Sequence, residues 1–262
     1  MSLKNVLALF LLAYLTSVHS AEFSKPNDNG IVHMTGEIHR GDAEKLVKIF
    51  TTTPAITALV LNSPGGDLLE ALKISRLVHE GQIAVLVLSP GICASACFFI
   101  FIEGASRLAV GSDSLPITKL GKVGLHRPYF PNPSASEKHL QQQFELMSKV
   151  KSYLDRKLIP SRLTDLMMSR PSNNIYWLTQ DDLEMIGEFT PELEELYIAK
   201  CGYNRTAIAE HANAKLRGDF LQAKRLDEEI TSATSCIGRI QINSYFDFVN
   251  KLRKGWRPKI VI

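Results

Sequence analysis

The chain has 262 residues, with 30 basic and 27 acidic side chains and a net charge of +3. So small a charge on a chain of this length gives no reason to expect a nucleic-acid partner. Hydrophobic residues make up 45% of the sequence and charged residues 22%, a balance that is typical of globular proteins.

The amino-terminal residues 1–20 have the layout of a secretory signal peptide. An apolar run from Val6 to Leu15 follows the basic Lys4, and the compact Val18 and Ser20 occupy the positions that a signal peptidase reads. The run is too short for a permanent membrane helix, and no later apolar segment is long enough. We therefore expect cleavage after Ser20, export to the periplasm or the medium, and no stable membrane span; an uncleaved anchor is the alternative.

The next segment alternates between apolar strands and amphipathic helices. Strands are predicted at 31–35, 56–61, 83–88 and 106–110, and helices at 41–50, 67–79 and 94–103. Repeated β-α-β units with nearly all-apolar strands predict an α/β fold with a parallel sheet covered on both faces. A surface loop is predicted over 111–123.

Three short motifs in this region have the residues of an acyl-transfer site. Ser95 lies at the entrance of a predicted helix, where unpaired N–H groups and the helix dipole suit an oxyanion. The turn Ser63-Pro64-Gly65-Gly66 ends another strand, and its glycines permit close backbone approach to a ligand. His126 adds a base. Taken singly, each motif has a plainer explanation as a tight turn or a packing residue.

In this order, Ser63-Pro64-Gly65-Gly66, Gly91-x-x-x-Ser95 and His126-x-Pro128 resemble the Clp protease proteolytic subunit and its ClpP/crotonase relatives. The resemblance covers residues 31–187, including Trp-Leu-Thr-Gln-Asp-Asp-Leu at 177–183. It implies an α/β fold of repeated ββα and βαβ units wound into a spiral. It also implies a peptide or unfolded protein as substrate and a homo-oligomer. No metal-ligand or phosphate-binding spacing occurs, so neither a metal nor another cofactor is expected.

The resemblance assigns roles position by position. Ser95 matches the catalytic serine, His126 the catalytic histidine, and Gly66 with the N–H of Ala96 the oxyanion hole. The family's aspartate is not found, and Asn174 lies beside its position; an asparagine orients a histidine without stabilising its positive charge. The expected function is an exported, ATP-independent serine endopeptidase. The alternative is an inactive Clp-like protein that binds peptides or assembles through the inherited fold.

Other chemistries stay open on the sequence alone. Lys119 or Lys122 is an alternative base, in a Ser-Lys dyad. A thiol nucleophile at Cys93 or Cys97 is a further option, although neither occupies the family's nucleophile position. A crotonase-like enzyme that acts on acyl-CoA is the third functional class.

Four cysteines in an exported protein favour disulfides. Cys201 and Cys236 flank predicted helices and are expected to join them. Cys93 and Cys97 lie on either side of Ser95 and are candidates for a bridge that braces the turn; a role as buried filler is the alternative.

The remaining residues are predicted to be mostly helical. A long amphipathic helix is expected over 134–158 and a shorter one from Pro160 to Ser169. Two or three helices follow, including 205–216 and 219–231, and then 245–252. These predictions divide the chain into a signal peptide at 1–20, a ClpP-like α/β domain at 21–189 and a helical carboxyl-terminal region at 190–262.

Overall fold

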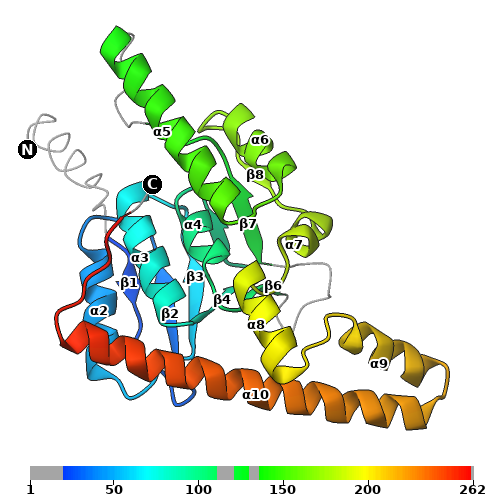
Figure 1. Ribbon diagram of the computed structural model, residues 1–262. Helices are drawn as coiled ribbons and strands as arrows, with labels where there is room; N and C mark the ends of the chain where they lie inside the picture. Colours follow the sequence, from blue (N-terminus) through cyan, green and yellow to red (C-terminus); the bar gives the residue numbers. More distant parts are fainter. Residues whose placement is uncertain (1–19, 111–120, 130–135, 261–262) are drawn as a thin grey trace, which may run out of the picture.

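The computed structural model describes residues 20–110, 121–129 and 136–260 (Figure 1). The predicted signal peptide, apart from Ser20, and Lys119 lie outside these ranges. The strands are β1 (Glu22–Phe23), β2 (Ile31–Thr35), β3 (Ala58–Asn62), β4 (Ala84–Leu88), β5 (Ile92–Ala94), β6 (Arg107–Val110), β7 (Lys122–Leu125) and β8 (Tyr176–Trp177). The helices are α2 (Asp42–Thr52), α3 (Leu68–Glu80), α4 (Cys97–Ile102), α5 (Glu137–Arg156), α6 (Ser161–Ser169), α7 (Gln180–Ile186), α8 (Pro191–Cys201), α9 (Ala207–Leu216) and α10 (Phe220–Arg253).

The strands form two sheets. The main sheet has the order β1-β2-β3-β4-β6, in which β2, β3, β4 and β6 are parallel and β1 is antiparallel at the edge. The second sheet has the order β5-β7-β8, with β5 and β7 parallel. Each step between parallel strands of the main sheet passes through a helix, α2, α3 or α4. The predicted α/β fold class is confirmed.

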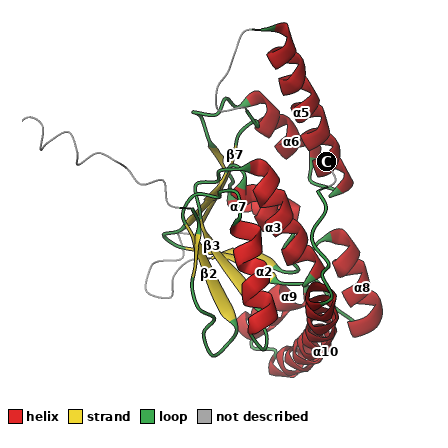
Figure 2. Ribbon diagram, turned by 90° about the vertical axis from the view of Figure 1, so that its left-hand side faces the viewer, coloured by secondary structure: helices red, strands yellow, loops and turns green. Residues whose placement is uncertain are grey.

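Helices α2 and α3 lie on one face of the main sheet (Figure 2), and the end of α10 packs against these two helices. The prediction that helices cover both faces is wrong at β2. On β2 the side chains of Val32 and Met34 are buried, while those of His33 and Thr35 alternate with them and are exposed. Only a strand such as β3, in the middle of the sheet, has a continuous run of buried residues.

The second sheet corrects two predicted boundaries. The helix predicted from Ala94 begins at Cys97, because Ile92–Ala94 form β5 and pair with β7. The loop predicted to continue to Val123 ends earlier, because Lys122 and Val123 belong to β7. Both strands have four residues or fewer, which is too short for an alternating pattern to stand out.

Helix α10 corrects the predicted carboxyl-terminal region. The helices expected at 219–231 and 245–252 are parts of one continuous helix, Phe220–Arg253. Polar and small residues weaken the helical pattern between them. However, Ala233 and Ile237 within that stretch are buried, and Cys236 lies at disulfide distance from Cys201 at the end of α8, with the two Cα atoms 5.5 Å apart.

The last turns of α10 belong to the main hydrophobic core. Phe248 packs edge to face on Phe50 of α2, with ring centroids 5.6 Å apart, and Tyr245 contacts the same ring at 6.2 Å. The helix therefore connects the core with α8 and α9 (Figure 1). Among the described residues, no helix combines the length and the apolar character needed to cross a bilayer.

A buried carboxylate, Glu103, joins α3, α4 and α5. It follows the last residue of α4 and is 3% exposed. Lys157 contacts it at 2.8 Å, His79 of α3 at 3.0 Å, and the hydroxyl of Tyr153 donates to it. Burial alone raises the pKa of Glu103, but the hydrogen bond from His79 and the charge of Lys157 outweigh that effect and lower the pKa to about 2.

We expect Glu103→Gln to reduce the free energy of unfolding by about 3 kcal/mol at neutral pH, the equivalent of this pKa shift. Because the pKa of Glu103 is lower in the folded state, its carboxylate stabilises the fold fully above the ordinary glutamate pKa, and this stabilisation is lost as the pH falls through about 2. Urea unfolding of both proteins at pH 7 and pH 3 measures the difference in the free energy of unfolding. The matched control is Asp155→Asn, which breaks the exposed 2.9 Å pair with Lys151; its cost is expected to stay below about 0.5 kcal/mol. An equal loss in the free energy of unfolding for both variants would contradict the stabilising role of Glu103.

Candidate active site

The chain turns sharply at Ser95 between β5 and α4. The φ angle of Ser95 is +56°, a left-handed conformation that residues with a side chain rarely adopt. The turn is held by its backbone: the N–H of Ser95 donates to the carbonyl of Gly124 (3.0 Å), and its own carbonyl accepts from Phe98 (3.0 Å). Strain at a strand-to-helix turn is the geometry that exposes a nucleophilic hydroxyl. Within the described ranges, the hydroxyl of Ser95 makes no hydrogen bond.

The turn is braced on both sides. All residues of α4 are buried, so the helix that follows Ser95 is embedded in the core. Cys93, before the turn, and Cys97, the first residue of α4, lie at disulfide distance, with Cα atoms 5.2 Å apart. A covalent loop therefore encloses Ser95.

The glycine turn after β3 packs directly against the serine turn. The N–H of Ser63 donates to the carbonyl of Ile92 (2.7 Å), and its carbonyl accepts from the N–H of Ala94 (3.0 Å). A Cβ atom on Gly65 would lie 2.6 Å from the Cβ of Ser95. Only glycine permits this approach, which explains the residue type at position 65.

Each turn contributes one free backbone N–H group. The groups on either side of Gly66 bond to Ile38: its N–H donates to Gly65 (2.7 Å), and its carbonyl accepts from Asp67 (2.8 Å). Backbone groups alternate in direction along an extended chain, so the N–H of Gly66 points away from Ile38. It has no acceptor in the described parts of the chain, and neither has the N–H of Ala96 at the start of α4. Both residues line the same cavity as Ser95.

Strand pairing brings His126 to the same place. In the parallel register of β5 and β7, Ala94 lies opposite Gly124. Ser95 and His126 therefore follow the ends of two neighbouring strands, which in a sheet run about 4.8 Å apart. Both side chains line one cavity, as the proposed catalytic pair requires.

A backbone carbonyl orients the imidazole of His126. Nδ1 lies 2.8 Å from the carbonyl oxygen of Arg127. A carbonyl oxygen only accepts, so Nδ1 carries the proton and Nε2 keeps its lone pair. The N–H of Arg127 donates in turn to Arg170 (2.9 Å), which holds the carbonyl in place. His126 is 8% exposed, and the ring of Tyr129 lies beside it at a centroid distance of 5.9 Å.

Asn174 is not among the residues that line the cavity. Its backbone N–H donates to Pro171 (2.9 Å), and its side chain is exposed. The contact that orients His126 comes instead from Arg127. Sequence reasoning missed this group because every residue has a carbonyl, so a main-chain contact leaves no signal in the residue types.

The other candidate groups of the sequence also lie elsewhere. The Nζ atom of Lys122 lies 5.8 Å from the ring centroid of Trp177. Cys93 and Cys97 pair with each other. None of these side chains lines the cavity. Among the described residues, no group of three or more histidine, cysteine and acidic side chains is arranged to hold a metal ion.

The cavity has a volume of about 450 Å³ and mainly apolar walls. Its apolar lining comes from the first turn of α3, from α4, from the segment after His126 and from α5: Leu68, Leu69, Phe99, Pro128, Tyr129 and Leu146. Glu145 and Lys149 of α5 add charge at one side.

No family model matches the chain, and no curated protein sequence matches it. Among solved structures, the chain is similar to ClpP1 from Listeria monocytogenes, with 19% sequence identity and a TM-score of 0.44 over 61% of this chain and 88% of that one. An asparagine-to-aspartate variant of the same ClpP1 gives a TM-score of 0.45 with the same identity and coverage. A serine-to-alanine variant of the 1510-N membrane-bound stomatin-specific protease has 16% identity and a TM-score of 0.41, over 65% of this chain and 83% of its own.

Proposed function

We propose that this protein is an exported serine peptidase with Ser95 as nucleophile and His126 as base. The observation that carries the proposal is one cavity that holds four elements of acyl transfer. These are the strained Ser95, the imidazole of His126 with its proton on Nδ1, and the free N–H groups of Gly66 and Ala96.

In the proposed reaction, Nε2 of His126 takes the proton from Ser95 as the hydroxyl attacks a peptide carbonyl. The N–H groups of Gly66 and Ala96 hold the negative oxygen of the tetrahedral intermediate. His126 then passes the proton to the leaving amine, and water releases the acyl group by the same steps in reverse order. A neutral carbonyl stabilises the imidazolium less than a carboxylate does, so we expect slow turnover.

Export, independence from ATP and assembly belong to the same proposal. The two cysteine pairs at disulfide distance suit an oxidising compartment, and an exported enzyme has no ATP-driven unfoldase to feed it. The substrate is therefore a short or unfolded peptide.

Leu140 and Phe144 on the projecting half of α5 are 52% and 73% exposed (Figure 1), which supports contact with a second copy of the chain.

A second cavity next to the first supports a preference for acidic peptides. Its volume is about 300 Å³. Phe99 lines the first cavity and Tyr153 the second, and their ring centroids are 5.9 Å apart. The basic residues around the second cavity come from α3, from the carboxyl-terminal end of α5 and the residue after it, and from the carboxyl-terminal segment: Arg76, Arg156, Lys157 and Lys259. The carboxylate of Glu103, which is paired with Lys157, also lines it.

The four cations differ in their ion pairs. Lys157 pairs with Glu103, and Arg76 with Glu80 at 2.6 Å. Arg156 and Lys259 have no carboxylate partner in the described part of the chain. The cavity is therefore suited to a carboxylate of the substrate, which the planar guanidinium of Arg156 can bind through two hydrogen bonds.

We expect Arg156→Gln to lower kcat/KM about tenfold for a peptide with a glutamate beyond the cleaved bond, because a charge-assisted contact is lost. The rate for the same peptide with glutamine is expected to stay unchanged. Lys151→Gln, on the same helix but with its charge already paired to Asp155, is the matched control. An equal fall for both peptides would contradict a charge-selective role.

Labelling with a fluorescent fluorophosphonate, followed by peptide mapping, tests the proposed function. The expected result is one labelled residue, Ser95, at several pH values from about 6 to 9, a range that covers both protonation states of an ordinary histidine. No labelling across that range, together with measurable peptide binding, would support the inactive peptide-binding protein instead.

A further inference from the structure

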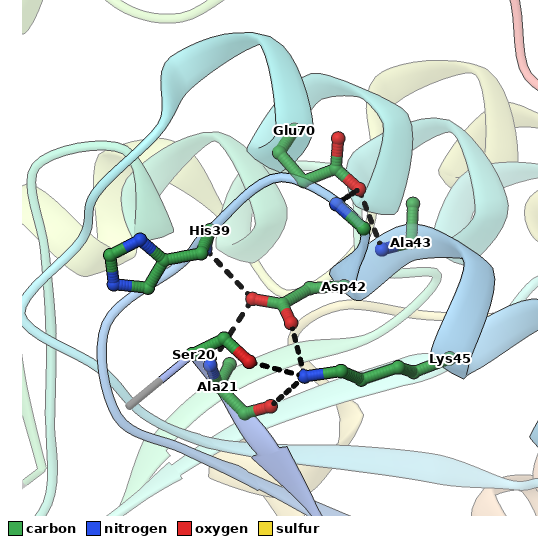
Figure 3. A network of polar contacts seen from close by, with 8 residues as sticks. Ser20, Ala21, His39, Asp42, Ala43, Lys45 and Glu70 are labelled. Carbon is green, nitrogen blue, oxygen red and sulfur yellow. Dashed lines mark hydrogen bonds and ion pairs between the residues drawn. The ribbon is translucent and has the colours of Figure 1, made fainter. Parts of the chain in front are cut away.

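A buried carboxylate, Asp42, holds the backbone at Ala21 (Figure 3). Neither residue has any exposed surface. The N–H of Ala21 donates to Oδ2 of Asp42 (3.2 Å), and the ammonium of Lys45 donates to the other oxygen, Oδ1 (2.8 Å). Lys45 also donates to the carbonyl of Ala21 (3.1 Å) and contacts the hydroxyl of Ser20. The first residue after the predicted cleavage site is thus enclosed by charged groups.

Cleavage after Ser20 would change the chemistry of that contact. The nitrogen that now donates as a neutral amide would become a charged α-ammonium, at the same position against Asp42. A hydrogen bond from an ammonium to a carboxylate is roughly twice as strong as one between neutral groups. We infer that Asp42 is the binding site for the α-ammonium of Ala21 in the processed chain, and that this ion pair secures the active-site glycine turn. The inference rests on the export that we propose.

The connection from Asp42 to the glycine turn is short. Oδ2 of Asp42 also accepts from the N–H of His39 (2.8 Å). The preceding residue, Ile38, makes the two hydrogen bonds on either side of Gly66, and its backbone lies so close that a Cβ on Gly66 would be 2.2 Å from its carbonyl oxygen. An ion pair that fixes the backbone at position 39 therefore also fixes the N–H of Gly66.

A second set of contacts ties the same segment to α3. Oε1 of Glu70 accepts from the N–H groups of Gly41 (3.0 Å) and Ala43 (2.8 Å) in the first turn of α2 (Figure 3). Oε2 of Glu70 binds Lys73 at 2.8 Å. Glu70 is thereby occupied, which leaves Asp42 as the carboxylate that receives Ala21.

The charges that face the new terminus are identical in a processed and an extended chain. They are Asp42 and Lys45 on α2, Glu70 on α3, and His39 with Glu37, 3.6 Å apart, on the connecting segment. Lys45 and the α-ammonium use different oxygens of Asp42, so they do not compete for one acceptor.

Two purified proteins test the inference, one that starts at Ala21 and one with several extra residues before Ser20. We expect the melting temperature of the Ala21 form to be higher by roughly 2–4 °C at pH 7. An ion pair with Asp42 would raise the pKa of the α-amino group above its ordinary 7.7–8.0. Its stabilisation is therefore present below that range and lost as the pH rises through the raised pKa, so the difference should vanish near pH 10.

Asp42→Asn in both forms should remove the difference at pH 7. Should that variant fail to fold, the pH dependence of the unaltered pair carries the test. Equal melting temperatures at pH 7, or a difference that persists near pH 10, would overturn the inference. Faster fluorophosphonate labelling of the Ala21 form is the expected consequence at the active site. If neither form is labelled, the peptidase proposal fails, while the stability comparison still decides the role of Asp42.

Discussion

Ser95→Ala is expected to abolish peptide hydrolysis and fluorophosphonate labelling while leaving the fold intact. The hydroxyl of Ser95 makes no hydrogen bond in the described ranges, and alanine tolerates the +56° φ angle as well as serine does, so the free energy of unfolding should not change. The loss of kcat should reach about 10³-fold or more, as for other nucleophiles that act together with a base.

The same mechanism predicts that His126→Ala and the double variant fall to one common residual rate. Nucleophile and base act as a unit, so removing the second costs little once the first is gone. Rates measured with a fluorogenic peptide, and unfolding in urea for each variant, give both quantities. Additive losses, or a Ser95→Ala variant that still hydrolyses peptide, would exclude the Ser-His mechanism.

Gly66→Ala is expected to lower kcat/KM by about 10²–10³-fold, the usual cost of losing one oxyanion donor. A Cβ at this position would lie 2.2 Å from the carbonyl oxygen and 2.7 Å from the nitrogen of Ile38, and the φ angle of +137° is unfavourable for any other residue. The turn must move to accept the methyl group, and its N–H then leaves the oxyanion position.

Gly255→Ala is the matched control for that substitution. Gly255 also has a positive φ angle, +91°, but a Cβ there meets no atom within 4 Å. The variant at position 255 therefore tests the effect of backbone strain alone. The variant at position 66 adds the displacement of the glycine turn by the new methyl group. Similar rates for both variants would show that the N–H of Gly66 has no special role; melting temperatures separate loss of the site from loss of the fold.

The elements that sequence patterns predicted best are those with long, regular periodicity. Strands β2, β3 and β4 and helices α2, α3 and α5 lie within a few residues of their predicted positions. Strand β3 is a continuous run of buried residues, and the others bury one clear face. Strand β5 has three residues and β8 has two, too few for any period. Helix α10 runs through a stretch of weak helix formers, where tertiary packing and the Cys201–Cys236 contact override local propensity.

The candidate site depends on contacts that residue types alone do not show. Ser95 and His126 meet because β5 pairs with β7, and the sequence predicted neither this pairing nor the strands that make it. The resemblance of the motif order to ClpP was what predicted Ser95 and His126 as a catalytic pair. It proposed Asn174 as the orienting group, whereas the contact at Nδ1 comes from the Arg127 carbonyl.

The contact between Cys93 and Cys97 also bears on how the protein is prepared. Dithiothreitol in a buffer, or synthesis in a reducing cytoplasm, would open the covalent loop around Ser95 and leave the strained turn held by its hydrogen bonds and by the packing of α4. Material folded under oxidising conditions and kept free of thiols therefore retains the enclosed serine on which the activity measurements depend.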